Sequence, residues 1–272
     1  MICKSILCPY SGEASRGSGL KHAVKLAKLY DAHLTGVMRH GRPLLERRFA
    51  AQIPDHLLST LRDADDTKSK EVAERFKTIT ADAGLAGHAE FFDLNPAKHG
   101  PMAEFARSFD LIVTGAHSVS SDDDTHLSAN PDMLALQSGR PVVVVPDGYE
   151  ADGLATRTLV AWDGKRSATR AISDALGVLA EKSHVTLLSV GATPRNTDVL
   201  LKTLKRHHIE VDARTVAKKG SIADTIQREA AKDGSKLIVM GAFEHSKFSH
   251  DLFGGVTTDV IRHSTVPVFM AH

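Results

Sequence analysis

The chain has 272 residues, of which 42% are hydrophobic, so it can form one large or two modest domains with a substantial core. Its 34 Lys and Arg residues balance 33 Asp and Glu residues and only 5% of residues are aromatic, which argues against nucleic acid as the main partner. No N-terminal apolar segment or stretch of roughly 20 apolar residues is present, so we expect a cytoplasmic protein that does not contact the membrane.

The first half of the chain alternates apolar runs with amphipathic segments. A first strand lies within Lys4–Ser15, and the helix that follows carries its apolar residues on one face, at Leu20, Ala23, Val24, Ala27 and Tyr30. The remaining elements predicted here are strands at His33–Met38 and Ala89–Phe92, a long helix ending near Gly84, a helix at Pro101–Arg107 and a fifth strand at Pro141–Val145.

The second half repeats the first. Gly241 aligns with Gly115 and Pro267 with Pro141, and both offsets are 126 (241 − 115 and 267 − 141). Near the start of each half Asp163 aligns with Ser11, an offset of 152 (163 − 11), so the first half holds 26 extra residues (152 − 126). We assign this surplus to a basic loop and the start of the long helix, around Arg39–Lys70.

The elements predicted for the second half follow the same order. They are a first strand within Arg157–Ala168, strands at His184–Val190 and Glu210–Val216, a helix at Ile222–Lys232, a strand at Leu237–Met240, a helix at Val256–His263 and a strand at Val266–Met270. Alternating strands and helices predict an α/β fold with two tandem doubly wound parallel sheets. We expect domains at residues 1–146 and 157–272, joined by the polar linker Asp147–Thr156.

A ligand crevice is expected in the second half. In open parallel sheets ligands bind at the carboxyl ends of the strands, where the strand order reverses. Asp163, Val190, Gly241 and Gly254 are all expected at such ends. Gly254 and Gly255 also precede the helix Val256–His263, so free backbone N–H groups and the hydroxyls of Thr257 and Thr258 form the outline of a phosphate site.

The stretch from Lys236 to Pro267, KLIVMGAFEHSKFSHDLFGGVTTDVIRHSTVP, resembles the universal stress proteins. Nucleotide-binding members of that family carry G-x2-G-x9-G-[S/T] between their last two strands. Gly241 and Gly254 fill the first and third places, whereas Glu244 replaces the second glycine and Gly255 the Ser or Thr. The resemblance implies a stress-response protein that binds ATP, ADP or AMP for signalling or sensing.

The resemblance also implies roles for individual residues. Asp163 would read the adenine, although Asp-Gly is equally a common turn pair, and Val190 would lie against the base. The fifth strands would pair the two domains as an internal pseudo-dimer, and a homodimer is a further option. The full candidate site for the nucleotide consists of Ala161, Trp162, Asp163, Val190, Met240, Gly241, Glu244, Lys247, Gly254, Gly255, Val256 and Thr257.

Glu244 complicates nucleotide binding. A carboxylate about 4 Å from a phosphate oxygen repels it by ~1 kcal/mol in water. The side chain could turn outward, bind Mg²⁺ together with the phosphates, or have its charge offset by Lys247. The alternative is a scaffold that binds no nucleotide and acts through protein contacts or a small apolar ligand.

The first half has lost the motif. Ser11 replaces the aspartate, and the loop after the fourth strand carries Ser118, Ser128 and Ala129 at the motif positions, with three carboxylates at Asp122–Asp124. Three negative charges oppose a polyanion, so we predict no nucleotide here. Asn130-Pro131 reads instead as an ordinary helix start.

Other chemistries have little support. Cys3 and Cys8 read as reduced structural thiols on opposite faces of the first strand, and the fifteen histidines show no zinc-site spacing, so we assign no metal site. The segment Ser11–Ser15 faintly resembles the SGGxDS loop of ATP pyrophosphatases but lacks its essential residues. No set of nucleophile and base is visible, so we expect slow ATP hydrolysis at most.

Overall fold

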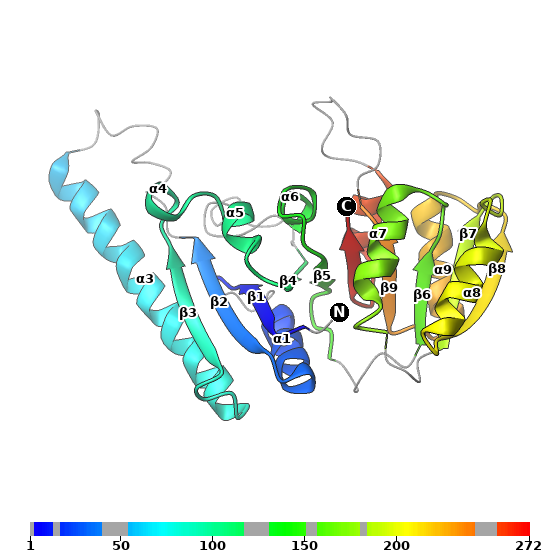
Figure 1. The fold of residues 1–272 in the computed structure, drawn as a ribbon. Helices are drawn as coiled ribbons and strands as arrows, with labels where there is room; N and C mark the ends of the chain where they lie inside the picture. The colour runs from blue at the N-terminus through cyan, green and yellow to red at the C-terminus, as the bar shows by residue number, and fades with distance from the viewer. Residues whose placement is uncertain are drawn as a thin grey trace.

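The computed structural model describes residues 3–12, 17–39, 54–116, 131–150, 157–179, 184–242 and 255–272. Part of the predicted linker, residues 151–156, and most of the predicted basic loop, residues 40–53, lie outside the described residues. The described strands form one ten-stranded sheet in the order β3-β2-β1-β4-β5-β10-β9-β6-β7-β8 (Figure 1).

The first half contains strands β1 (Ser5–Pro9), β2 (His33–Arg39), β3 (Ala89–Leu94), β4 (Leu111–Gly115) and β5 (Val142–Val145). Its described helices are α1 (Gly17–Tyr30), α3 (Asp55–Asp82), α4 (Pro96–His99), α5 (Met102–Ala106) and α6 (Pro131–Gln137). The second half contains β6 (Arg157–Ala161), β7 (His184–Val190), β8 (Glu210–Val216), β9 (Leu237–Gly241) and β10 (Val268–Ala271). Its described helices are α7 (Arg166–Ala175), α8 (Thr197–Arg206), α9 (Ile222–Asp233) and α10 (Val256–His263).

Each half is a parallel sheet, and its strand order reverses once. In the first half the reversal falls between β1 and β4, and in the second between β6 and β9. The predicted fold, two tandem doubly wound α/β units, is therefore confirmed. The expected pairing of the fifth strands is also confirmed, because β5 and β10 pair antiparallel and join the two halves into one sheet.

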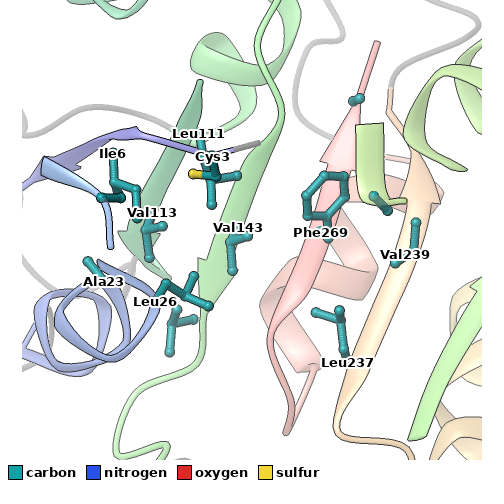
Figure 2. Packing of buried hydrophobic residues seen from close by; sticks show 14 of the residues in the cluster. Cys3, Ile6, Ala23, Leu26, Leu111, Val113, Val143, Leu237, Val239 and Phe269 are labelled. Carbon is teal, nitrogen blue, oxygen red and sulfur yellow. The ribbon is translucent and has the colours of Figure 1, made fainter. Parts of the chain in front are cut away.

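The β5–β10 junction has an internal twofold relation. Val143 pairs with Phe269, and these residues occupy equivalent positions of the repeat (269 − 143 = 126). Figure 2 shows both side chains among the buried residues on this face of the sheet. Asp132 of α6 and Thr258 of α10 are likewise equivalent (258 − 132 = 126), and the Thr258 hydroxyl donates to Asp132 Oδ2 at 3.5 Å. Burial raises the pKa of Asp132 against the opposing effects of Thr258 and Arg262.

Helices cover both faces of the sheet. Alternate strand residues point to opposite sides, so Ile6 and Cys8 belong to the cluster that extends under α1, α3, α7 and α8, while Leu7 belongs to the cluster under α5, α6, α9 and α10. The prediction that the cysteines occupy opposite faces is wrong, because Cys3 precedes β1 and packs in the same cluster as Cys8. Burial raises the pKa of Cys3 to about 11 and that of Cys8 to about 12, as expected for unreactive thiols.

The two halves differ most at their outer ends. The 28-residue helix α3 runs alongside β3 (Figure 1). Its Phe76 packs so closely on Gly36 of β2 that a Cβ there would lie 2.4 Å from the ring. In the second half the shorter α8 covers β8. The sequence interpretation assigned no helix to residues 197–206, although Leu200, Leu201 and Leu204 follow a helical period.

We expect Phe269→Ala to lower the free energy of unfolding by about 3–5 kcal/mol, because it empties a fully buried ring position at the centre of the junction. Urea unfolding followed by circular dichroism measures this loss. The control Leu29→Ala, at a side chain that is 43% exposed, should cost less than about 1 kcal/mol. Equal effects of the two substitutions would contradict the central role of the junction.

Candidate functional site

The carboxyl ends of β7, β6 and β9 lie side by side in the second half. Val160 of β6 pairs with Val239 of β9, and Ala161 pairs with Leu188 of β7. Continuing these registers by two residues places Trp162 level with Gly241, and Asp163 level with Val190. The strand order reverses between β6 and β9, so these residues lie where open α/β sheets bind ligands.

Asp163 initiates the turn that leads from β6 into α7. Its Oδ1 accepts a hydrogen bond from the Lys165 amide at 3.0 Å, and the residue is exposed. Gly164 adopts φ +77°, and a Cβ there would lie 2.7 Å from Pro194 Cβ, so the glycine is required in this turn. The other carboxylate oxygen, Oδ2, accepts no hydrogen bond from the residues that the structure describes.

Trp162 does not present its ring to the ligand side of the sheet. Its indole packs in the core beneath α7 and α8, and Nε1 donates to Thr197 Oγ1 at 3.1 Å. Its backbone is also engaged, since the amide donates to Leu188 O at 2.8 Å and the carbonyl accepts from Ser189 Oγ at 3.0 Å. Trp162 therefore fixes the end of β6 and the start of α8. Sequence interpretation missed Ser189 and Thr197, which carry out this positioning.

The opposite face at the same edge is apolar. Ala161, Val190 and Val256 are partly buried against the cluster that lies under α9 and α10, and Met240 of β9 belongs to that cluster with 4% exposure. These residues come from β6, β7, β9 and α10, and the fold gathers them on one side of the sheet. Half-buried aliphatic side chains of this kind suit one face of a planar ring.

Gly241 has a packing role. A Cβ at this position would lie 2.4 Å from the Ala168 amide nitrogen and 2.6 Å from the Ser167 carbonyl carbon of α7. The first half shows a similar close contact, because a Cβ on Gly19 of α1 would lie 2.4 Å from the amide nitrogen of Gly115. The close approach of the first helix of each half to β4 or β9 therefore explains Gly241 without a ligand.

The start of α10 has an exposed glycine cap. Gly255 is the N-cap residue with φ +140°, and no described residue lies within 4 Å of the position that its Cβ would take. Because glycine has no side chain, the N-cap residue itself cannot bond the first N–H groups of the helix, which have no intrahelical acceptors. Thr257 is buried, and the Thr258 hydroxyl donates to Asp132 Oδ2. Glu244, Lys247 and Gly254 lie outside the described residues.

The corresponding edge of the first half is covered by α3. Ser11 is 4% exposed, unlike its exposed counterpart Asp163. Arg75 of α3 donates from Nη1 to Gly12 O at 2.8 Å, and Val72 packs on Gly12, where a Cβ would lie 2.7 Å from it. Helix α6 begins at Pro131 as the sequence predicts, but Ser118, Ser128, Ala129 and Asp122–Asp124 lie outside the described residues.

The described part of the chain holds neither a membrane-spanning helix nor a cluster of metal-binding side chains. No helix in it is both long and apolar enough to span a bilayer. Within the same residues, no group of three or more His, Cys, Asp or Glu side chains is arranged to hold a metal ion.

We expect Gly241→Ala to destabilise the protein by about 1–3 kcal/mol in the absence of any ligand, because backbone atoms of α7 must move. The matched control is Gly17→Ala, at a helical glycine with open space, which should be neutral or slightly stabilising. Thermal unfolding measures both effects. Recovery of stability in Gly241→Ala/Ser167→Gly would contradict the explanation, since the Ser167 and Ala168 backbone atoms remain in place.

Comparison with known proteins agrees with this architecture. Residues 195–272 match the model of the Universal stress protein family. Universal stress protein Slr1230 from Synechocystis sp. is 23% identical over 228 residues, which cover 79% of this chain and 78% of that protein.

Solved structures extend the likeness to both halves. A universal stress protein from Archaeoglobus fulgidus superposes with a TM-score of 0.72 at 18% identity, covering 98% of this chain and 96% of that one. A structure from Pseudomonas aeruginosa PAO1 gives a TM-score of 0.54 at 16% identity, covering 99% and 92%. The fold is thus shared with tandem universal stress proteins over nearly the whole chain, and residues 195–272 also match that family in sequence.

Proposed function

We propose that the second half, residues 157–272, binds one adenine nucleotide at the carboxyl ends of β6 and β9, and that this binding serves signalling or sensing under stress. The observation that carries the proposal is Asp163, whose second oxygen is unengaged by the described residues beside an apolar surface at the switch point.

Base recognition would use both features. The exposed Oδ2 of Asp163 accepts a hydrogen bond from the exocyclic amine of adenine, while Oδ1 keeps the turn to Lys165. Ala161, Val190 and Val256 offer the aliphatic surface for the ring. A hydrogen bond to a charged acceptor contributes about 1.5–3 kcal/mol, which corresponds to roughly ten- to a hundredfold in affinity.

The phosphates would lie at the start of α10. Gly255 leaves open space there, and the N-terminal end of a helix attracts anions through its unpaired N–H groups and its dipole. Gly254, Lys247 and Glu244 belong to the same proposal from sequence, with Glu244 either turned away or holding Mg²⁺ with the phosphates. We propose no catalytic residue, and ATP hydrolysis would be slow at most.

The first half, residues 1–146, would have no nucleotide site. Ser11 is buried and cannot offer a carboxylate, and Arg75 and Val72 cover the turn at Gly12. The stoichiometry expected from this asymmetry is one nucleotide per chain.

A scaffold without nucleotide is the second candidate. It is favoured by one specific observation, that close packing on α7 already accounts for Gly241, the first glycine of the motif. In that case the protein would act through contacts with partners or a small apolar ligand, and a homodimer is one such assembly.

The decisive variant is Asp163→Asn. Asn keeps an oxygen to accept from the Lys165 amide, so the turn and the stability should persist, but its NH₂ group opposes the adenine amine. We expect ATP affinity to fall at least about tenfold. Calorimetry of nucleotide-free protein measures affinity and stoichiometry, and the single tryptophan, Trp162, provides a fluorescence signal next to the site.

The control is Asp212→Asn, at an exposed aspartate on β8, which should leave ATP binding unchanged. Unaltered affinity in Asp163→Asn would reject the proposed base recognition, and absence of ATP binding by the unmodified chain would favour the scaffold. Titrating the protein with ATP in the presence and absence of Mg²⁺ tests the role of Glu244. If ATP binds only with Mg²⁺, the Glu244 carboxylate is assigned to the metal ion.

A further inference from the structure

A cavity of about 400 Å³ opens at the edge of the sheet opposite the proposed nucleotide site. It lies where β9 begins and α9 and α10 end, and its lining includes Gln227, Arg228, Ala231, Ser235, Ile238 and Val266. Its volume falls in the range of about 300–1,000 Å³ that is usual for small-molecule sites. Neither the nucleotide motif nor the proposed function uses any of these residues.

The internal repeat has smaller residues beside this cavity than at the matching positions of the first half. At the offset of 126, Ala231 and Ser235 are the counterparts of Phe105 and Phe109 in the first half (231 − 105 and 235 − 109). There Phe105 stacks on Phe92 of β3 with centroids 4.7 Å apart and contacts Phe109 at 5.4 Å. The second half carries only a methyl and a hydroxymethyl group at these two repeat positions, and both residues line the cavity.

A third difference between the halves affects the C-terminal ends of α9 and α10, which border the cavity. Val266 is the counterpart of Arg140 (266 − 140 = 126). Arg140 Nε donates to Arg107 O at 2.8 Å, and Arg107 Nη2 donates to Gln137 O at 3.3 Å, so guanidinium groups close the ends of α5 and α6. The side chain of Val266 has no hydrogen-bond donor, so it cannot link the ends of α9 and α10 as Arg140 links the ends of α5 and α6.

The charges around the cavity are positive. Arg228 and Lys236 line it, and neither forms a salt bridge with another residue in the described ranges. At the end of α9 the carbonyls of Ala230 and Ala231 accept hydrogen bonds from the Gly234 and Ser235 amides. The floor is apolar, with Ile238 1% exposed and Val266 partly buried.

We propose that this cavity is a second ligand site, which binds a small amphipathic organic anion. The apolar body of the ligand packs on Ile238, Val266 and Ala231, and its anionic group pairs with Arg228 and Lys236 at the rim. The site is independent of the nucleotide site, because the two lie at opposite ends of β9.

The test uses two fluorescent probes, the anion 1-anilinonaphthalene-8-sulfonate and its neutral relative N-phenyl-1-naphthylamine. We expect the unmodified chain to bind one equivalent of the anion with increased emission. Ala231→Phe, which puts a ring into the lining of the cavity, should reduce affinity at least tenfold. Val266→Arg puts a long side chain into the same lining and should act in the same direction, so it carries the test if Ala231→Phe does not fold.

Charge is tested separately. Arg228→Gln/Lys236→Gln should weaken binding of the anionic probe about tenfold and leave the neutral probe within twofold. The matched control Lys205→Gln/Arg206→Gln removes two exposed positive charges from α8 and should change neither probe. Unchanged binding of the anionic probe in a folded Ala231→Phe or Val266→Arg variant overturns the site, and equal losses in the two charge variants overturn the role of Arg228 and Lys236.

Discussion

The antiparallel pairing of β5 with β10 is the interaction on which the rest of this structure depends. Without it each half would be a five-stranded sheet with an unpaired apolar edge, and such edges promote aggregation. The pairing buries both edges and centres the repeat on Val143 and Phe269. It also brings α6 and α10 together, so that Asp132 of one half accepts a hydrogen bond from Thr258 of the other.

Much of this arrangement could be predicted from sequence because buried parallel strands leave a simple signal. Continuous apolar runs and the constant offset of the repeat located β4, β5, β9 and β10, and the bounds of β7, β8 and α10 agree with the structure to the residue. Helix α8 was missed because its apolar residues, Leu200, Leu201 and Leu204, sit among polar ones in a short segment. The face taken by Cys3 was mispredicted because strand alternation does not extend to a residue before the strand.

The candidate site was less predictable because a residue type does not reveal its partner. A glycine after a strand is compatible with a ligand or with a crowded helix, and only coordinates show Gly241 beneath the Ala168 amide. Trp162 is next to Asp163 in sequence, yet its indole lies on the other face of the sheet. The expected turn at Asp163 and the glycine cap of α10 did follow from local sequence, since both depend on neighbouring backbone atoms.

The pair at the centre of the junction is unequal in size, and this has a consequence for how chains associate. Phenylalanine from one half fills the space beside valine from the other. Pairing two second halves would bring two such rings together, whereas pairing two first halves would leave a void between valines, and either mismatch is unfavourable in a close-packed core. The duplication has thus diverged into complementary surfaces, so that a first half pairs with a second half in preference to another copy of itself.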